Sequence, residues 1–528
     1  MKQIPFQKTG FFSKIMHHYL EKNKRITPFY GNFPDFNGFE KQIKDKQKSV
    51  QTQSRILLVD VLKKQYKQIE SSLKTQKNIE LLQNKNTFTI TTGHQLNLFT
   101  GPLYFLYKII STINLCEKLS EKFPNQNFVP VYWMATEDHD FEEINFFNFK
   151  GNKIKWNSNQ TGAVGRFSTD GLQEVFDELS DKLGNSKNAN ELKQLFSDGY
   201  IKHANLTDAT RFIANQLFGK YGLIILDADD ASLKREFVPF VKEELFTQVS
   251  HKKVSKTITD FSKNYKAQVN PREINLFYLT DGLRERIVLK DEIYTVNNTD
   301  IKWSKSEIRK EVCNFPERFS PNVIMRPLYQ EVILPNLCYI GGGGEIAYWL
   351  ELKAFFKAVK IPFPILLLRN SVQIISEKQQ KKLQKLDVSV EELFLKQPDL
   401  IAKKVLEKAQ VSVDFTMQKQ FLQTQFNQLK EVAKQTDVSF IGAVNAQEKK
   451  QLNGLDNLEK RLLRAEKRKQ SELVNNIVKL QNKLLPNQSL EERQRNFSEY
   501  YLEYGEGFIQ ILKENLNPIH LEFTVVLL

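Results

Sequence analysis

The first 375 or so residues alternate short apolar runs of strand-like composition with stretches of helical periodicity. This alternation is typical of an α/β protein with a parallel sheet. The clearest runs lie at residues 88–91, 128–135, 223–226, 337–340 and 363–368. Several are followed by polar or Gly-rich residues. The pattern therefore places those residues beyond the carboxyl ends of strands, where open α/β sheets bind their ligands.

Two changes of pattern divide the chain further. Between residues 276 and 296, short extended pieces alternate with turn signals, which predicts a β insertion near 276–300. From residue 376 the composition changes to Gln, Lys, Glu and Leu, with almost no Gly or Pro until Pro486. We therefore predict a core over residues 1–375, an α-helical domain over 376–487, and a C-terminal segment, 488–528, that ends in a strand of the main sheet.

The helical domain has apolar seams at spacings of three and four residues. In the later helix, predicted over 447–484, these residues are Leu455, Leu458, Leu462, Ala465, Leu473, Ile477, Leu480 and Leu484; in an earlier helix they are Phe415, Leu422, Phe426 and Leu429. Two such helices can pack on one another or on a second chain as an antiparallel coiled coil. We expect a homodimer through this coiled coil, and the alternative is a helical bundle within one chain.

Composition narrows the class of protein. The 528 residues are 41% hydrophobic, enough for a large core, yet no stretch approaches the ~20 apolar residues that span a bilayer. The amino terminus also lacks the apolar segment of a signal peptide, so we expect a cytoplasmic protein without a membrane partner. The three cysteines form no metal-binding pattern, and we expect each to be a small buried residue. The net charge is +14, but Lys is spread along the chain, and nucleic-acid binding is not the favoured interpretation.

The segment 91–107, TTGHQLNLFTGPLYFLY, follows a strand and opens a helix. Gly93 and Gly101 allow close approach to the backbone, Pro102 suits a first helical turn, and the helix N-terminus offers free N–H groups to an anion. A nucleotide phosphate is the natural candidate, with His94 and Gln95 beside it, although a lone His is more often structural. GPLYFLY also resembles the GPLHIGH type of signature of class I aminoacyl-tRNA synthetases, with Tyr104 in place of a histidine.

A dense acidic turn follows the second strong strand. Asp138, His139 and Asp140 stand between Glu137 and a further acidic pair. Carboxylates this close repel one another unless they face a cation, a bound amine or solvent. They could therefore accept a substrate ammonium or hold magnesium with a nucleotide, and a solvated acidic turn is the alternative.

The third constellation lies in residues 320–349, which contain four successive glycines after a strand. Glycines in this number let the backbone pass close to a ligand or adopt positive φ. Glu345 then stands near a helix start, where it could bind a substrate amine or hydroxyls. Arg326 can bind a carboxylate or phosphate through its planar fork, and we group Asn322 with it.

Five segments together resemble a known family: TTGHQLNLFTGPLY, FVPVYWMATEDHDFEEIN, GLIILDADD, SPNVIMRPLYQ and YIGGGGEIAYWLELK. In order, wording and spacing they resemble the BshC family of bacillithiol biosynthesis, over most of the chain. The sequence departs from the family pattern at Tyr107, where His is frequent, and at Gly343, where Pro is frequent.

The resemblance implies a Rossmann-like core similar to class I aminoacyl-tRNA synthetases, with a coiled-coil appendage. It also implies the last step of bacillithiol synthesis, in which L-cysteine is added to glucosaminyl malate. Because a carboxylate is a poor electrophile, we expect ATP with Mg²⁺ to activate the cysteine carboxyl, as in the synthetases. The expected catalytic residues are His94, Asp138, His139 and Asp140. The expected nucleotide-binding residues are Gly93, His94, Gln95, Gly101, Pro102 and Tyr104, and the expected substrate-binding residues are Asn322, Arg326, Gly342, Gly343, Gly344 and Glu345.

Two other functions remain open at this stage. One is another nucleotidyl-transfer enzyme or acid-amine ligase that acts on a different acid. The other is a nonenzymatic nucleic-acid or scaffold protein built on the basic residues of the helical domain, which are Arg461, Arg464, Lys467, Arg468 and Lys469. The second explains the charge but assigns no role to the polar strand ends.

Overall fold

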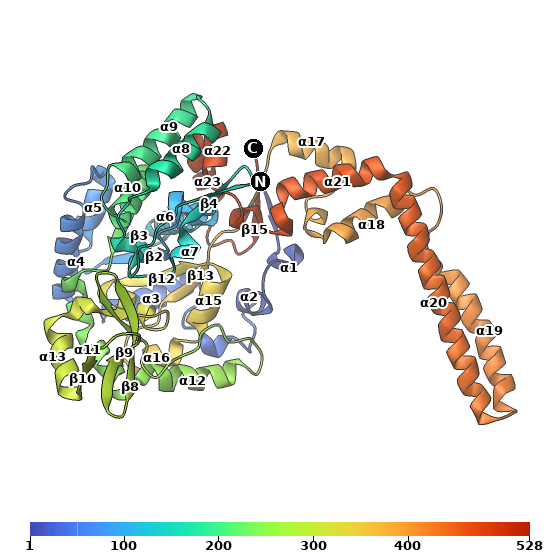
Figure 1. Ribbon diagram of the computed structural model, residues 1–528, viewed down its shortest axis with the longest axis horizontal. Coiled ribbons are helices and arrows are strands. Elements are labelled where there is room, and N and C mark those ends of the chain that lie inside the picture. Colours follow the sequence, from blue (N-terminus) through green and yellow to red (C-terminus); the bar gives the residue numbers. More distant parts are fainter. Residues whose placement is uncertain (50) are drawn as a thin grey trace. The chain divides into compact units, whose positions relative to one another are not determined.

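The computed structural model describes residues 1–49 and 51–528 (Figure 1). The chain forms two compact units. The first comprises Met1–Gln7, Phe11–Val372 and Glu491–Thr524, and the second comprises Lys8–Gly10, Gln373–Leu490 and Val525–Leu528. The chain thus leaves the first unit after Val372 and re-enters it at Glu491.

The first unit is built around a sheet of five strands in the order β13-β12-β2-β3-β6. These strands are β2 (Thr87–His94), β3 (Asn127–Met134), β6 (Ile224–Asp227), β12 (Asn336–Gly341) and β13 (Ile365–Leu368). All neighbouring pairs are parallel. Each strand coincides with one of the predicted apolar runs, which confirms the α/β class.

Helices α3 (Phe36–Gln47) and α6 (Tyr104–Lys122) pack in one apolar core with the strands. Phe39 of α3 and Leu119 of α6 meet Ile90, Ile340 and Leu367 of the sheet in this core. Each Å² of apolar surface that this core removes from water stabilises the fold by about 25 cal/mol. The core fixes the strand ends from which the site is built.

The cysteines differ in their surroundings. Cys116 and Cys338 are free and buried, and burial raises the pKa of both thiols. Cys313, on helix α13 (Lys305–Asn314), is exposed. The prediction of a buried residue is therefore confirmed for the first two and wrong for Cys313.

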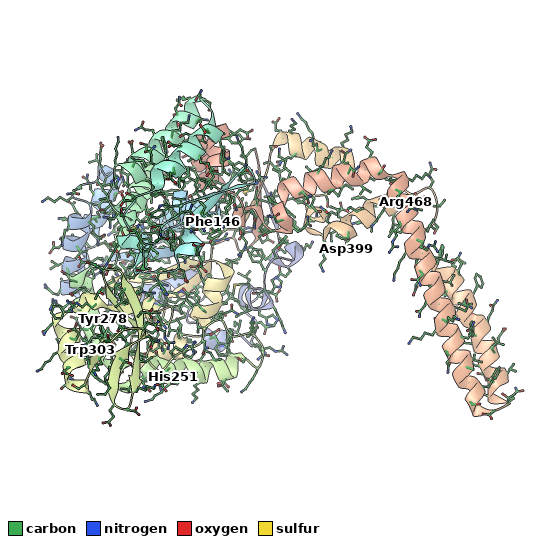
Figure 2. The ribbon with its side chains drawn as sticks, in the orientation of Figure 1. Phe146, His251, Tyr278, Trp303, Asp399 and Arg468 are labelled. Carbon is green, nitrogen blue, oxygen red and sulfur yellow. The ribbon has the colours of Figure 1, made fainter. Side chains whose placement is uncertain are left out.

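A second sheet of the first unit is antiparallel, in the order β10-β9-β8-β7-β11. Its strands are β7 (Leu276–Thr280), β8 (Leu283–Lys290), β9 (Ile293–Val296), β10 (Lys302–Trp303) and β11 (Phe319–Pro321). Tyr278 and Trp303 pack edge to face, with ring centroids 4.9 Å apart (Figure 2). Gly282 turns between β7 and β8 with a φ of 72°, a conformation that favours glycine.

The second unit is helical. Its helices are α17 (Glu377–Leu386), α18 (Gln397–Lys408), α19 (Thr416–Lys434), α20 (Val438–Lys469) and α21 (Ser471–Leu484). Helices α19 and α20 pack on one another through Phe426, Ala433 and Val444. The continuous helix expected over 447–484 is wrong, because Gln470, with a φ of −100° and a ψ of 34°, separates α20 from α21.

The last apolar run forms strand β15 (Phe523–Leu527). The parallel sheet β13-β12-β2-β3-β6 does not include β15, so the expected return of this segment to the main sheet is wrong. Across the described ranges 1–49 and 51–528, no helix is long and apolar enough to cross a membrane.

Candidate active site

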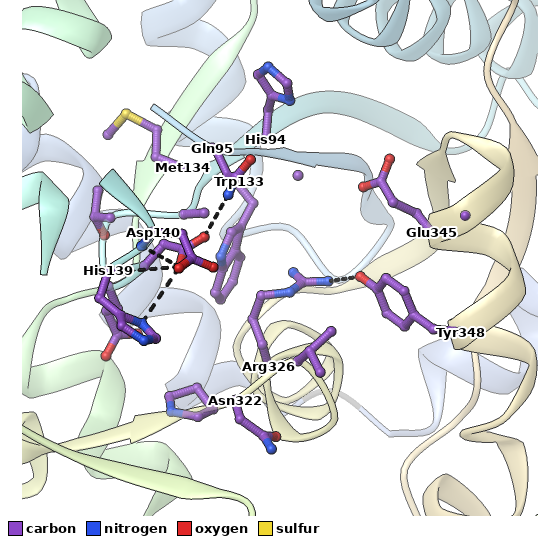
Figure 3. Close-up of a pocket in the computed structure, with 18 of the residues that line it drawn as sticks. His94, Gln95, Trp133, Met134, His139, Asp140, Asn322, Arg326, Glu345 and Tyr348 are labelled. Atoms are coloured by element: carbon purple, nitrogen blue, oxygen red, sulfur yellow. Dashed lines mark hydrogen bonds and ion pairs between the residues drawn. The ribbon is translucent and has the colours of Figure 1, made fainter. Parts of the chain in front are cut away.

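A pocket of about 730 Å³ opens at the carboxyl ends of β2, β3 and β12. All of its walls belong to the first unit. It gathers these predicted residues: Gly93, His94, Gln95, Tyr104, Asp138, His139, Asp140, Asn322, Arg326, Gly342, Gly343, Gly344 and Glu345. In Figure 3 the acidic turn with His139 and Asp140 lies on one side, Glu345 and Tyr348 lie on the other, and Arg326 lies between them.

The remaining two predicted residues lie elsewhere. Pro102 lines a neighbouring cavity of about 230 Å³, and Gly101 lines neither space. The N-terminus of α6 is closed by the chain itself, because Leu103 N–H donates to the Arg495 carbonyl at 2.8 Å. Asn496 Nδ2 donates to the Gly101 carbonyl at 2.6 Å. The N–H groups expected to face a phosphate are thus partly used within the protein.

Glu345 and Lys108 form a buried ion pair on one wall. Glu345 belongs to helix α15 (Gly343–Leu350), and its Oε2 lies 2.6 Å from Lys108 Nζ. The same carboxylate accepts hydrogen bonds from Gly342 N–H at 2.8 Å and from the Tyr339 hydroxyl at 2.7 Å. Burial acts to raise the pKa of Glu345, but Lys108 and these donors bring it below its usual value. Glu345 is therefore ionised and largely occupied.

Arg326 has no such partner. Its guanidinium donates to Gln330 Oε1 at 3.1 Å and to the Tyr348 hydroxyl at 3.4 Å, and it forms no ion pair with a carboxylate in the part of the chain that the structure describes. Gly93 keeps the space beside it open, because a Cβ there would lie 3.2 Å from the Tyr339 hydroxyl and 3.8 Å from Arg326 Nη1. A buried charge needs compensation, so the geometry favours an anionic ligand at Arg326.

The acidic turn is held by a network. Gln95 Nε2 donates to Asp138 Oδ2 at 3.0 Å, and Asp138 Oδ1 accepts the His139 N–H at 2.7 Å. His139 Nδ1 lies 2.6 Å from Arg284 Nη1, and the Arg284 guanidinium stacks 4.1 Å from the Phe277 ring centroid. Arg284 thus offsets part of the repulsion among the carboxylates.

Glu137, the first residue of the turn, faces inward. It pairs with the buried Lys234 at 2.5 Å, and Lys234 also lies 3.1 Å from Asp229. Lys234 thus bridges two carboxylates, and Asp229 also pairs with Arg166 at 2.9 Å, so two cations face two carboxylates here. Within residues 1–49 and 51–528, no group of three or more His, Cys, Asp or Glu side chains is arranged to hold a metal ion.

Comparison with protein families identifies the chain. The family model for the N-terminal Rossmann-like domain of bacillithiol biosynthesis BshC matches residues 1–370. The model for the C-terminal coiled-coil domain of BshC matches residues 372–528. The chain belongs to the BshC family. Family membership confirms the expected Rossmann-like core and coiled coil, and it places the chain among the ligases of bacillithiol biosynthesis.

Curated BshC relatives match along the full length. The protein of Flavobacterium johnsoniae is 58% identical over 99% of both chains. That of Flavobacterium psychrophilum is 57% identical over 99% of this chain and 98% of its own. That of Christiangramia forsetii is 55% identical over the same shares. All three bear the name "Putative cysteine ligase BshC".

One solved structure also aligns with the chain. It is titled a "putative arginyl t-RNA synthetase" from Campylobacter jejuni, and it matches over 84% of this chain and 98% of its own at 9% identity, with a TM-score of 0.22. A score this low says nothing about a common fold.

The sequence did not predict two important pocket residues of this BshC chain, Lys108 and Arg369. Lys108 lies on the apolar face of α6, where a buried lysine without a partner would be costly. Its place among apolar residues could therefore have indicated a buried ion pair. Arg369 follows β13 directly and forms a double ion pair with Glu492, at 2.7 and 3.0 Å. Its partner is distant in sequence, so no local pattern reveals the pair.

Proposed function

We propose that the chain joins L-cysteine to glucosaminyl malate, with ATP as the source of carboxyl activation. Its curated relatives are named cysteine ligases, and its family is assigned to bacillithiol biosynthesis. The observation that carries the proposal is the pocket's separation of charge: an arginine without a carboxylate partner on the floor, and a cluster of carboxylates on one side. The proposed substrates carry both kinds of complementary group.

In this arrangement Asp138 and Asp140 bind the cysteine ammonium. Their carboxylates line the pocket beside Gln95, which holds Asp138 in place. Arg326 binds a malate carboxylate of the acceptor, because its planar fork matches a carboxylate and has none as a partner among residues 1–49 and 51–528. Glu345 contributes by holding Lys108, rather than by contacting the acceptor strongly, since its oxygens already accept three donors.

ATP would bind where Gly93, His94, Gln95 and Tyr104 line the pocket together with Gly343 and Gly344. When bound, it would convert the cysteine carboxyl into a better electrophile for the glucosamine nitrogen. The residues then mainly place the two reactants and stabilise charge. Mg²⁺ would be held by the phosphates of the nucleotide.

The test is direct. Purified protein is incubated with cysteine, glucosaminyl malate and ATP, and bacillithiol, AMP and ADP are followed by mass spectrometry. We expect bacillithiol to form together with one nucleotide product, at a rate that depends on all three substrates. Nucleotide turnover with a different acid and none with cysteine would refute the proposal and favour another acid-amine ligase.

A further inference from the structure

A second, much smaller cavity adjoins the pocket at His94, which lines both. Its volume is about 10 Å³. One buried water needs roughly 10–15 Å³. The polar walls of this cavity come from His94, Gln95, Asn97, Thr100, Tyr132, Tyr200 and Thr210.

Four polar atoms in these walls lack a hydrogen-bond partner within the described residues: His94 Nε2, Asn97 Oδ1, Thr100 Oγ1 and Thr210 Oγ1. Their side chains are almost fully buried, with exposed fractions of 7%, 8%, 7% and 8%. An unsatisfied buried polar group destabilises the folded state, because it loses its hydrogen bonds to water. Four such atoms around a space the size of one water indicate a ligand that bonds to all of them.

The backbone beside the cavity is strained. Phe99 and Thr100 have φ angles of 47° and 69°, which is uncommon for residues other than glycine and especially for a β-branched one. Such a conformation persists only where the surrounding structure holds it. It is held by Tyr200, whose hydroxyl accepts the Phe99 N–H at 2.7 Å, and by Asn496, which donates to the Phe99 carbonyl at 2.7 Å. The fold thus maintains a strained turn whose Thr100 hydroxyl lines this cavity.

We propose that the cavity binds one internal water, and that this water orients His94 as a hydrogen-bond donor toward the main pocket. Asn97 Nδ2 donates to the Glu143 carbonyl at 3.2 Å, so its Oδ1 is the acceptor left for the cavity. The hydroxyls of Thr100 and Thr210 can donate to the two lone pairs of the water. Its two hydrogens then go to Asn97 Oδ1 and His94 Nε2.

A His94 Nε2 that accepts a hydrogen bond carries no proton, so the proton of the neutral ring lies on Nδ1. Burial, together with the charges of Lys108 and Arg369, lowers the pKa of His94 well below its usual value, so the ring stays neutral. His94 then presents an N–H without a charge to a carboxyl or phosphate oxygen in the pocket. The water is independent of the proposed function, whereas this contact of His94 with a substrate rests on it.

Two measurements on the full-length protein test the water without any substrate. A high-resolution crystal structure should show one ordered water within hydrogen-bond distance of His94 Nε2 and Asn97 Oδ1. NMR of protein labelled with ¹⁵N-histidine, with His94→Gln to assign the signal, should show the Nδ1–H tautomer. An empty cavity, or an Nε2–H tautomer, would overturn the proposal.

Substitutions at Thr210 test the positioning role. Thr210→Val keeps the shape but removes one donor to the water, and Thr210→Ser keeps the donor. Losing one hydrogen bond of about 0.5–1.5 kcal/mol predicts a mixture of His94 tautomers and a kcat lowered about two- to tenfold in Thr210→Val. Thr210→Ser should resemble the wild type in both. If the two variants give the same tautomer, the water does not orient His94; changed tautomers with unchanged kcat would refute the contact with substrate.

Discussion

Arg326 and Glu345 were predicted together as substrate ligands, and the folded chain distinguishes them. The oxygens of Glu345 accept bonds from Lys108, Tyr339 and Gly342, so little of its capacity remains for a ligand. Among the described residues, the guanidinium of Arg326 donates to the neutral acceptors Gln330 and Tyr348 and lies 5.5 to 5.9 Å from three aromatic ring centroids. Of these two residues, Arg326 is therefore the one whose charge has no carboxylate partner among the described residues.

The first prediction follows from that difference. Arg326→Lys keeps a positive charge but loses the fork that binds a carboxylate through two bonds. Losing a charge-assisted hydrogen bond costs about 1.5–3 kcal/mol, so the KM for glucosaminyl malate should rise roughly ten- to a hundredfold, while the KM for cysteine changes little. Steady-state kinetics measure both. The exposed Arg461→Lys serves as the control, and equal effects on both substrates would contradict the assignment of Arg326 to the acceptor.

Asp138→Asn is the second prediction at this scale. It preserves shape and removes the charge proposed to hold the cysteine ammonium, so kcat/KM for cysteine should fall about ten- to a hundredfold, with little change in the melting temperature. Glu143→Gln is a matched control, because Glu143 Oε2 accepts the same Gln95 amide at 2.9 Å but does not line the main pocket. A similar loss in both variants would show that the Gln95 contact, and not the charge, matters.

Among the elements, local pattern predicted the strands of the main sheet and most of the pocket residues that follow them. It failed where distant segments meet. The closure of the α6 N-terminus by Arg495 and Asn496 brings together residues far apart in sequence, which no periodicity reveals. Gly101 has a φ of 63°, and a Cβ added there would lie only 2.6 Å from Asn97 Cβ. Backbone conformation and packing therefore explain why this residue is a glycine. Substituting it would test folding more than ligand binding.

A pH-dependent contact joins α15 to the loop before β7. Glu351 follows α15, is fully buried, and accepts N–H bonds from Gln268 at 2.7 Å and Val269 at 3.4 Å. Burial raises the pKa of Glu351 to about 7, and the two N–H donors only partly oppose this. Between the unfolded pKa of about 4.3 and this value, the folded state holds a proton that the unfolded state releases. Stability must therefore decrease as the pH rises through this range.

The third prediction is this decrease in stability with rising pH. Urea unfolding should show that the titration of Glu351 removes at most about 4 kcal/mol of stability between pH 4 and pH 7, with little further change above pH 7. Glu351→Gln should be the more stable protein at pH 8 by part of that amount and should lose this component of the pH dependence. Glu377→Gln, at an exposed position of α17, is the control. Parallel pH profiles for wild type and Glu351→Gln would contradict the raised pKa.

At the scale of the whole molecule, the fourth prediction is the homodimer through the coiled coil. Helix α19 exposes Met417 and Phe421, at 64% and 65%, although its other face packs on α20. A second chain would bury this apolar surface. Met417→Lys with Phe421→Lys should therefore give monomers in light scattering. The control Gln423→Lys with Asn427→Lys adds the same charge at exposed positions of α19 that lie off the Met417–Phe421 face, and it should leave dimers. An unchanged mass in the first variant would exclude this interface.

The ion pair of Arg369 with Glu492 has a consequence for biosynthesis. Arg369 precedes the long segment Gln373–Leu490 of the second unit, and Glu492, like the pocket residue Arg493, follows that segment. A ribosome therefore releases the five strands of the main sheet well before it releases the carboxylate that neutralises Arg369. During translation of the segment Gln373–Leu490, the nascent sheet carries the charged guanidinium of Arg369 without its partner Glu492. Maturation of the pocket is thus one of the last events of synthesis, and a chain truncated by a stop codon within α21 would have the sheet without a complete pocket.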